Sequence, residues 1–414
     1  MSSRRLVMVG GGAAGFFAAI AAAELGAEVT VLEKGSRFLD KVRISGGGRC
    51  NVTHACFEPR EFATRYPRGG RALLGPFQKF SASDTVAWFE SRGVKLKSEA
   101  DGRMFPVTDS SQTIVDCLLG AAREAGVKVQ LNCAVHSADI TGDGTFELAI
   151  VSGAAAEAGA SRRTVFCDRL LLATGGCRAA AAGRLALSLG HTLESPTPSL
   201  FTFQIESAWL RELAGVAAEA AVSVPGTKLR ERGPLLVTHW GMSGPAILRM
   251  SAWGARELHD LNYQFPLLVN WLPDLSAEGI GQEFQARRAS AGARLIMNVP
   301  VPPLSARLWE RLVAAAGVPR DQRWSALTRA DAQALIQHLT RTEFLVTGKS
   351  LNRDEFVTCG GVRLSEVNFK TMESKLCPGL YFAGELLDID GLTGGFNFQA
   401  AWTTGFIAGR AMAA

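Results

Sequence analysis

The stretch RLVMVGGGAAGFFAAIAAAELGAEVTVLEKG, from Arg5 to Gly35, decides the fold class because it has the layout of a strand, a helix and a second strand. The apolar run from Leu6 to Val9 predicts a short buried strand, and the alanine-rich run from Phe16 to Leu25 predicts a helix. Gly26 ends that helix, and Glu28 to Leu32 is predicted as the second strand. A helix that connects two such strands is typical of a parallel sheet, so the sequence predicts an α/β fold.

The turn between the first strand and the helix carries the pattern G-x-G-x-x-G at Gly10, Gly12 and Gly15. In this pattern the first glycine permits a tight turn, the second lets a pyrophosphate approach the backbone, and the third lets the helix pack closely on the strand. Glu33 ends the second strand, where a carboxylate can accept hydrogen bonds from an adenosine ribose. The unit therefore predicts dinucleotide binding. The charge of Glu33 disfavours the 2′-phosphate of NADP and leaves NAD and FAD open.

A second glycine cluster, ISGGGRCN from Ile44 to Asn51, favours FAD. Three consecutive glycines lack side chains, so backbone can lie against a flat or crowded ligand. Lys34, Lys41 and Arg49 add positive charge, and Arg49 and Asn51 can hydrogen-bond a pyrophosphate or a ring edge. FAD suits this position because its ribitol and isoalloxazine extend past the pyrophosphate. The alternative is a surface loop with solvated arginines.

Two later segments repeat the pattern of a strand that ends in glycine. The strand from Arg169 to Ala173 is followed by Thr174-Gly175-Gly176, and the strand from Leu380 to Ala383 is followed by Gly384-Glu385. A helix predicted from Phe398 to Met412 would direct its positive end toward charge that develops on a reduced flavin. Dinucleotide-type segments near both chain ends predict one FAD domain that a long insertion interrupts.

Bulk properties limit the alternatives. The chain has 414 residues with 47% hydrophobic content, which allows a large buried core, and its net charge of only +5 argues against a dedicated nucleic-acid protein. Its eight cysteines include no C-x-x-C pair, so zinc and dithiol sites are not expected, although Cys50 beside Arg49 could be a perturbed thiolate. The N-terminal apolar run resembles an export signal, but glycines interrupt it and Glu24 follows it. We expect a cytoplasmic protein with a small-molecule substrate, no bound metal, and no nucleic-acid or membrane partner; no oligomeric state is predicted.

Six segments carry a family resemblance over nearly the whole chain: GGGAAG, ISGGGRCNVT, DGRMFPVTD, THWGMSGPAIL, SLNRDEFVTCGGV and MESKLCPGLYFAGELLDIDGLTGGFNFQAAWTTG. They are similar to the bacterial BaiN/RdsA-type NAD(P)/FAD-dependent oxidoreductases, also called aminoacetone oxidase family flavoproteins. The resemblance implies a glutathione-reductase-like FAD-binding Rossmann domain, interrupted by an inserted β-barrel-like and helical domain, and flavin chemistry of the reductase type. Carried over by motif, it implies FAD contacts at Gly10, Gly12, Ala14, Gly15, Glu33, Lys34, Lys41, Ser45, Gly47, Gly48, Arg49, Asn51, Thr174, Gly175, Gly384, Glu385, Gly395 and Asn397.

Composition shifts along the chain predict the domain boundaries. The FAD-binding domain is expected over 1–190 and 346–414, with an inserted β-rich domain over 191–272 and an inserted helical domain over 273–345. Within the first part, the segment from Val127 to Val135 is expected to form an edge near the adenine, which adds Val135 to the cofactor contacts. Ser83 or Asp84 is expected to cap one helix and Thr328 another, and Gly153 to Ser161 is expected to be a hairpin tip.

The sequence offers few candidates for chemistry on a substrate. His239, between glycine-rich turns, could serve as a proton donor over the flavin, since the unperturbed pKa of histidine is about 6.5. Arg103 could orient a carboxylate or carbonyl group. Each has a plain alternative: local packing for His239 and a solvated hairpin for Arg103. Asn352 and Arg353 are weaker candidates of the same kind.

Three functions fit these features. The first is an FAD-dependent oxidoreductase that transfers a hydride through flavin N5 and uses NAD(P)H to reduce an activated C=C bond or a similar acceptor. The second is a flavin oxidase of a small amine that returns electrons to oxygen. The third is a redox-responsive flavoprotein that binds a partner such as RNA through a basic face at Arg60, Arg65, Arg68 and Arg71, although a solvated surface also explains these arginines.

Overall fold

The computed structural model describes residues 4–152, 161–177, 180–350 and 357–414, and the chain forms two compact units. The first comprises Met1–Ser199 with Val357–Ala414, and the second is Leu200–Phe356. The chain passes between the units at 199/200 and 356/357, later than the expected breaks at 190/191 and 345/346. The reason is that β11 (Leu193–Ser199) pairs with β18 (Val357–Val362), so both strands belong to the first unit.

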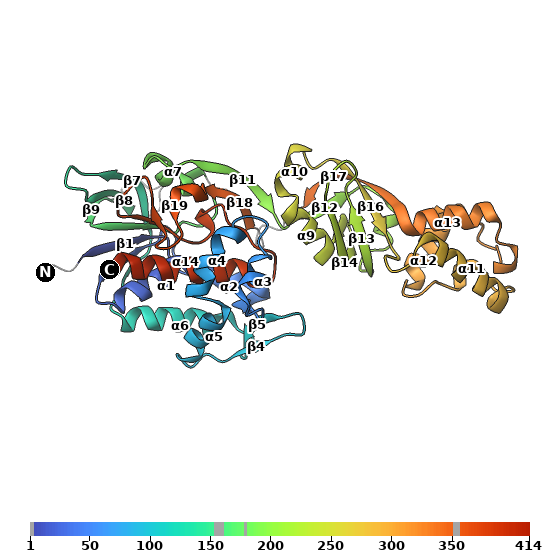
Figure 1. Cartoon of the computed structure of the whole chain (residues 1–414), viewed down its shortest axis with the longest axis horizontal. Helices are drawn as coiled ribbons and strands as arrows, with labels where there is room; N and C mark the ends of the chain where they lie inside the picture. The colour runs from blue at the N-terminus through green and yellow to red at the C-terminus, as the bar shows by residue number, and fades with distance from the viewer. Residues whose placement is uncertain (1–3, 153–160, 178–179, 351–356) are drawn as a thin grey trace. The chain divides into compact units, whose positions relative to one another are not determined.

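A mixed sheet forms the centre of the first unit (Figure 1). Its parallel strands are, in spatial order, β21 (Leu380–Phe382), β10 (Arg169–Leu172), β1 (Arg5–Val9), β2 (Glu28–Leu32) and β6 (Lys128–Gln130). Two short antiparallel strands, β19 (Val367–Asn368) and β20 (Glu373–Ser374), extend the edge beside β21. Strands from both ends of the chain thus lie in one sheet, as a single interrupted domain requires.

Two helices cover one face of this sheet and pack on each other through small residues. Helix α1 (Ala13–Ala23) and helix α14 (Phe396–Ala413) run side by side in Figure 1. A Cβ atom on Gly409 would lie 2.1 Å from the carbonyl oxygen of Ala18, and one on Gly405 would lie 2.5 Å from that of Ala14. The helices therefore approach backbone to backbone, and the middle of α14, at Gly405, lies beside the first turn of α1.

The remaining elements of the first unit surround the sheet and the helix pair. They are α2 (Asp40–Gly48), β3 (Thr53–His54), α3 (Pro59–Ala63), α4 (Gly70–Lys79), α5 (Ala82–Glu90), β4 (Leu96–Ser98), β5 (Arg103–Pro106), α6 (Ser111–Glu124), β7 (Cys133–Ile140), β8 (Phe146–Ser152), β9 (Ser161–Cys167), α7 (Ala180–Ser188), η3 (Leu364–Glu366) and η4 (Gly384–Leu386). The prediction for the cap of α5 was wrong: Ser81 is the N-cap and exchanges hydrogen bonds with Asp84 in a capping box. Most of the expected hairpin tip, residues 153–160, lies outside the described residues.

The second unit is a closed barrel with helices packed against it. The barrel order is β12 (Thr202–Ile205), β15 (Gly241–Ser243), β14 (Arg230–Thr238), β13 (Ala217–Ser223), β16 (Phe265–Asn270) and β17 (Thr342–Ser350). The helices are α8 (Ala208–Arg211), α9 (Pro245–Trp253), α10 (Ala255–Asp260), α11 (Ala277–Ala291), η1 (Ile296–Asn298), α12 (Ala306–Ala315), η2 (Trp324–Ala326) and α13 (Arg329–Arg341).

One hydrophobic core joins the barrel to these helices. The core includes Trp271 at the end of β16 together with Trp309 and Trp324 from the helical part, and all three side chains are fully buried. The β-rich and helical parts, expected as separate domains, share this core and lie in one compact unit. Thr328 caps α13 by accepting a hydrogen bond from Asp331 N, as predicted.

Within the described parts of the chain, none of the helices has both the length and the apolar character that a membrane span needs.

Candidate functional site

Three loops meet at the carboxyl edge of the parallel strands. They follow β1 at Gly10, β10 at Thr174 and β21 at Gly384. A Cβ atom on Gly10 would lie 2.2 Å from the carbonyl oxygen of Ala173, and the backbone N–H of Ala383 donates to the carbonyl of Leu172 at 3.2 Å. The loops are thus neighbours, and this edge is where open α/β sheets bind their ligands.

The glycines of the first loop divide into packed and open positions. Gly10 has a φ of +116°, and a Cβ atom on Gly15 would lie 1.9 Å from the carbonyl oxygen of Gly10, so helix and turn touch there. Gly12 is the N-cap of α1, and a Cβ atom on it would meet nothing within 4 Å. Ala14 is buried against α14. The helix therefore presents free N–H groups beside an open surface at Gly12, which fits a pyrophosphate.

Glu33 lies beside this turn at the end of β2. One carboxylate oxygen accepts a hydrogen bond from Gly11 N and the other from Gly35 N, both at 2.7 Å. The backbone of Glu33 also pairs with Gln130 and Cys133, which brings the start of β7, with half-buried Val135, to the same edge. Lys34 is exposed. This arrangement fixes a carboxylate next to the glycine turn, at the position where dinucleotide-binding domains hold a ribose.

The second glycine cluster forms a left-handed turn at the end of α2. Ser45 leaves the helical conformation with a ψ of 151°, and Gly46, Gly47 and Gly48 have φ values of 57°, 68° and 84°. A Cβ atom on Gly46 would lie 2.9 Å from the ring of Phe105, whereas one on Gly47 or Gly48 would meet nothing within 4 Å. The Ser45 hydroxyl donates to Val42 O at 3.0 Å. The turn offers bare backbone at Gly47 and Gly48 and a packed base at Gly46.

An ion pair between Lys41 and Glu385 joins α2 to the loop after β21. The second carboxylate oxygen of Glu385 accepts a hydrogen bond from Thr358 N at 3.1 Å. A Cβ atom on Gly176 would lie 2.8 Å from that oxygen, so the turn at Thr174 and Gly175 also reaches this pair. Gly175 has a φ of +80° and open space around it. The carboxylate is 19% exposed, so a hydroxyl-rich chain can reach it.

Asn51 and Asn397 hold the loop that leads into α14. With its amide oriented to satisfy its neighbours, Asn51 donates to Thr53 O and accepts from Gly395 N, both at 3.0 Å. Asn397 accepts from Gly391 N at 2.8 Å and donates to Gly391 O at 2.9 Å. Both amides serve backbone groups, so in this structure they position the start of α14; the predicted contacts with a cofactor stay predictions.

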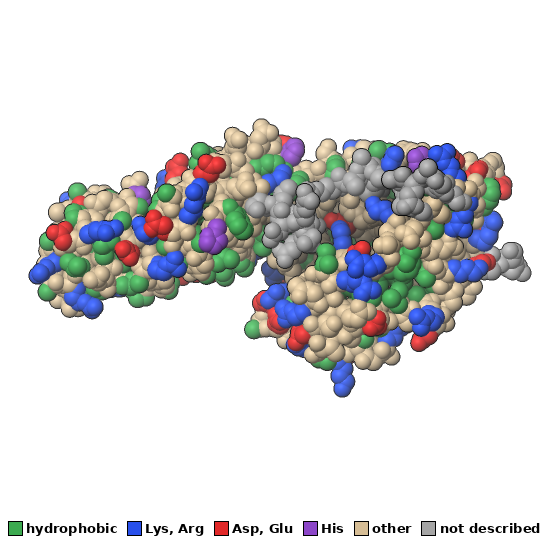
Figure 2. Space-filling view, turned by 180° about the vertical axis from the view of Figure 1, so that it is seen from behind, with side chains coloured by type: hydrophobic (Ala, Val, Ile, Leu, Met, Phe, Trp, Pro, Cys, Tyr) green, Lys and Arg blue, Asp and Glu red, His purple; other side chains and the backbone are tan. Residues whose placement is uncertain are grey.

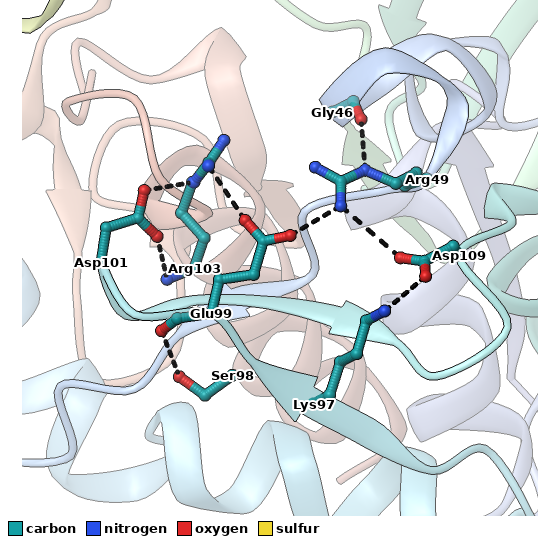
Figure 3. A network of polar contacts seen from close by, with 8 residues as sticks. All are labelled: Gly46, Arg49, Lys97, Ser98, Glu99, Asp101, Arg103 and Asp109. Carbon is teal, nitrogen blue, oxygen red and sulfur yellow. Dashed lines mark hydrogen bonds and ion pairs between the residues drawn. The ribbon is translucent and has the colours of Figure 1, made fainter.

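The two arginines of interest share one carboxylate (Figure 3). Glu99 accepts from Arg49 at 2.6 Å and from Arg103 at 2.9 Å, and Arg103 also contacts Asp101 at 2.8 Å. Arg49 stacks over Phe105 at 4.0 Å and lies 3.5 Å from Asp109. The hydrogen bond from Lys97 lowers the pKa of Asp109. Both guanidinium groups are thus engaged by the β4–β5 hairpin, and a ligand would have to share them.

His54 belongs to the same neighbourhood and was missed at the level of sequence. It is the cross-strand partner of Arg103, its Nε2 lies 3.1 Å from the carbonyl oxygen of Asp101, and its ring stacks on Phe396 at 4.8 Å. Among the described residues its Nδ1 has no hydrogen-bond partner. Burial lowers the pKa of His54, so a neutral imidazole packs beside the first residue of α14. No local signal connects positions 54, 101 and 396.

The other sequence candidates lie elsewhere. His239 is exposed in the turn between β14 and β15 of the second unit, 6.3 Å from the Trp240 ring, and its role over the flavin stays a prediction. Asn352 and Arg353 lie outside the described residues. Cys50 is not a perturbed thiolate of lowered pKa, because burial raises the pKa of its thiol to about 12. Over the described ranges, no cluster of His, Cys, Asp and Glu could hold a metal ion.

Arg68 does not contribute to the basic face that was considered for RNA binding. That side chain is buried in an ion pair with Asp390, and Arg65 pairs with Glu61 at 3.4 Å. Arg60 and Arg71 are exposed.

Comparison with known proteins shows the class and the family of this protein. The chain is 32% identical over 409 residues, covering 96% of this chain and 95% of the relative, to the "Ribosomal RNA dihydrouridine synthase" of Escherichia coli. It is 29% identical over 420 residues, covering 99% of both chains, to the "3-dehydro-bile acid delta(4,6)-reductase" of Clostridium scindens. The predicted class, a flavin-dependent oxidoreductase of the BaiN/RdsA group, is confirmed. The family model described as "HI0933-like protein Rossmann domain" matches residues 4–411, and the chain belongs to this family.

Solved structures support the architecture. The 3-ketosteroid-delta4-(5alpha)-dehydrogenase of Rhodococcus jostii shares 14% identity at a TM-score of 0.53, over 99% of this chain and 97% of that one. The 3-ketosteroid delta1-dehydrogenase of Sterolibacterium denitrificans shares 12% identity at a TM-score of 0.54, over 100% of both. A Rossmann-type domain with an inserted small barrel is confirmed, whereas the glutathione-reductase-like variant stays a prediction.

The partner prediction is only partly supported. One relative is named for a small molecule, but two are named for ribosomal RNA, so the expected lack of a nucleic-acid partner is not confirmed. Cytoplasmic location also stays a prediction.

Proposed function

We propose that this protein binds FAD at the carboxyl edge of its sheet and uses NAD(P)H to reduce a ring C=C bond conjugated to a carbonyl group. The observation that carries the proposal is the meeting of three glycine loops at that edge, with a carboxylate fixed on each side at Glu33 and Glu385. Open backbone at Gly12, Gly47 and Gly48 leaves room for the cofactor where a side chain would otherwise stand.

Bound FAD would supply the hydride transfer between the nicotinamide and the acceptor. The residues of the chain would bind and orient it: the N–H groups at the start of α1 for the pyrophosphate, Glu33 for the ribose, and Glu385 for the ribitol hydroxyls. The N-terminus of α14, held by Asn51 and Asn397, would stabilise negative charge on a flavin ring through its dipole. NAD(P)H is proposed to dock transiently, since the sequence has no second G-x-G-x-x-G unit.

The acceptor class comes from what the relatives' names have in common. Dihydrouridine is uridine with its ring double bond saturated, and a delta(4,6)-reductase of a 3-dehydro-bile acid also acts on ring double bonds near a carbonyl group. In either compound, conjugation with the carbonyl group would direct a hydride to the carbon remote from the carbonyl and a proton to the adjacent carbon. Reduction of a uracil ring in ribosomal RNA is the second candidate, and the 32% identity to the Escherichia coli relative favours it.

The cofactor is tested with purified protein by its absorption spectrum and by the variant Gly12→Asp. That change adds a negative side chain to an open position beside the phosphate site, so flavin content is expected to fall at least about tenfold. Gly75→Asp, inside α4, is the control, because a Cβ atom on Gly75 would also meet nothing within 4 Å. Equal flavin content in both variants would overturn the binding site.

The reaction is tested by anaerobic mixing with NADH and with NADPH, followed by addition of an acceptor. Bleaching of the flavin by one nicotinamide, and its recovery with a conjugated enone or with a ribosomal RNA fragment, is expected. Peroxide formation from amines without bleaching by either nicotinamide would replace the reductase with an oxidase.

A further inference from the structure

A cleft of about 430 Å³ lies in the second unit, within the barrel and helix assembly itself. Its lining includes Trp209 at α8, the side chains of Gln337, His338 and Arg341 in the last turns of α13, and Glu343 at the start of β17. This volume falls in the range of pockets that hold small ligands. No part of the flavin site described above contributes to it.

Contacts with the core of the second unit hold the residues that line the cleft. The Thr342 hydroxyl donates a hydrogen bond to the carbonyl of His338 and accepts one from the Trp271 indole at 2.9 Å. These two hydrogen bonds connect the end of α13 to the core. The Trp209 ring packs against Phe344, with the ring centroids 5.3 Å apart, and this contact restricts its orientation. The side chains at the cleft therefore stand on a rigid support.

The polar groups at the cleft are free to bind a ligand. Within the described parts of the chain, Arg341 is exposed and makes no ion pair, and the buried Nδ1 of His338 has no hydrogen-bond partner. Glu212, three residues after Trp209 in the sequence, is already paired, because Arg311 forms an ion pair with it and Arg307 donates to its backbone carbonyl. Basic and acidic side chains are interspersed on the face that Figure 2 shows, and no broad surface of a single charge is seen there.

We propose that this cleft binds an unpaired nucleotide, with the base against Trp209 and the phosphate at Arg341. An aromatic face and a guanidinium group are the two elements that bind bases and backbone in single-stranded nucleic acids. The Gln337 amide and the Glu343 carboxylate offer donors and acceptors for a base edge. The same chemistry is found in a free nucleotide and in a nucleotide of an RNA strand.

The test measures binding by the full-length protein, independently of reduction. A fluorescently labelled single-stranded oligoribonucleotide is titrated by anisotropy, and uridine monophosphate and NADPH are titrated by calorimetry. Trp209→Leu keeps an apolar contact with Phe344 but removes the stacking surface, and Arg341→Gln removes the charge. Each is expected to weaken binding about tenfold. Arg323→Gln is the matched control, since Arg323 is exposed in the same unit and does not line the cleft.

The outcomes separate the sources and the alternatives. Loss of oligoribonucleotide binding in both cleft variants, with the control unchanged, supports an RNA strand; the same loss for a mononucleotide or NADPH supports a free nucleotide. The proposal is overturned if Arg323→Gln weakens binding as much as Arg341→Gln does, or if none of the probes binds to the wild-type protein. Arg341 also complements the carbonyl end of α13, so melting temperatures are measured in parallel. A variant that melts normally but binds weakly supports the cleft, and one whose binding is normal contradicts it. None of these readouts depends on flavin reduction, so failure of the proposed reaction leaves them interpretable.

Discussion

Removal of Arg68 is expected to be among the most damaging single changes in the first unit. Its side chain is 12% exposed, and its partner Asp390 is 0% exposed. The Asp390 carboxylate accepts hydrogen bonds from two nitrogens of Arg68 and from the Ser199 hydroxyl at 2.8 Å. Arg68→Met keeps the length of the side chain but leaves a buried carboxylate without its cation. Breaking a buried pair in this way costs about 3–5 kcal/mol of unfolding free energy.

The loss should depend on pH in a defined direction. Burial raises the pKa of Asp390 even though Arg68 opposes that shift, so removal of Arg68 is expected to raise this pKa further. A carboxyl whose folded pKa exceeds its unfolded pKa contributes stability below the unfolded pKa and loses it as pH rises through the folded pKa. The Arg68→Met protein should therefore be less stable near neutral pH and should recover toward the wild type as the pH falls below the raised pKa of Asp390.

Unfolding of the first unit can be followed separately from the second by thiol labelling of Cys50, which is buried in the first unit. Urea titrations with pulsed labelling and mass spectrometry give its opening free energy. Adding Asp390→Asn to Arg68→Met should restore much of the loss, because no buried charge then remains. Arg65→Met is the control, since Arg65 makes an exposed pair worth at most about 1 kcal/mol. The reasoning is wrong if Arg68→Met loses less than about 1 kcal/mol and shows no pH dependence.

Three further predictions concern packing and side-chain chemistry. Gly409→Ala should destabilise the first unit by about 1–3 kcal/mol, because its Cβ would meet the backbone oxygen of Ala18, whereas Gly120→Ala at an open helical position should not; thermal melts compare them. Native Cys50 should alkylate very slowly near neutral pH, with the rate limited by burial and by a pKa of about 12, and fast modification in native buffer would contradict the structure. His54→Phe should reduce the loss of stability in acid. Burial lowers the pKa of His54, so its contribution to the unfolding free energy is present above the unfolded pKa and is lost as the pH falls through the folded pKa. Urea titrations at several pH values measure this, and an unfolding free energy that depends on pH as strongly in the variant as in the wild type would contradict the prediction.

Local sequence determined the nucleotide-binding unit. The strand expected from Glu28 to Leu32 has those bounds in β2, and the helix expected from Phe16 begins slightly earlier, at Ala13. The glycine spacing also located the three loops that meet at the sheet edge. These features depend on hydrophobic periodicity and on backbone conformations that glycine alone adopts readily, and both are properties of short segments.

The tertiary structure decided the ionic and polar neighbourhoods. Arg49 and Arg103 were judged as separate candidates, yet they share Glu99, and His54 became visible only beside Phe396. Likewise, the two parts of the insertion proved to be one unit because their tryptophans enter a common core. Such contacts join residues that are far apart in the chain. A local sequence pattern does not show which distant charged group or ring will contact a given side chain in the folded protein. The short segments therefore located the glycine loops at the sheet edge, and only the folded chain decided which side chains surround those loops.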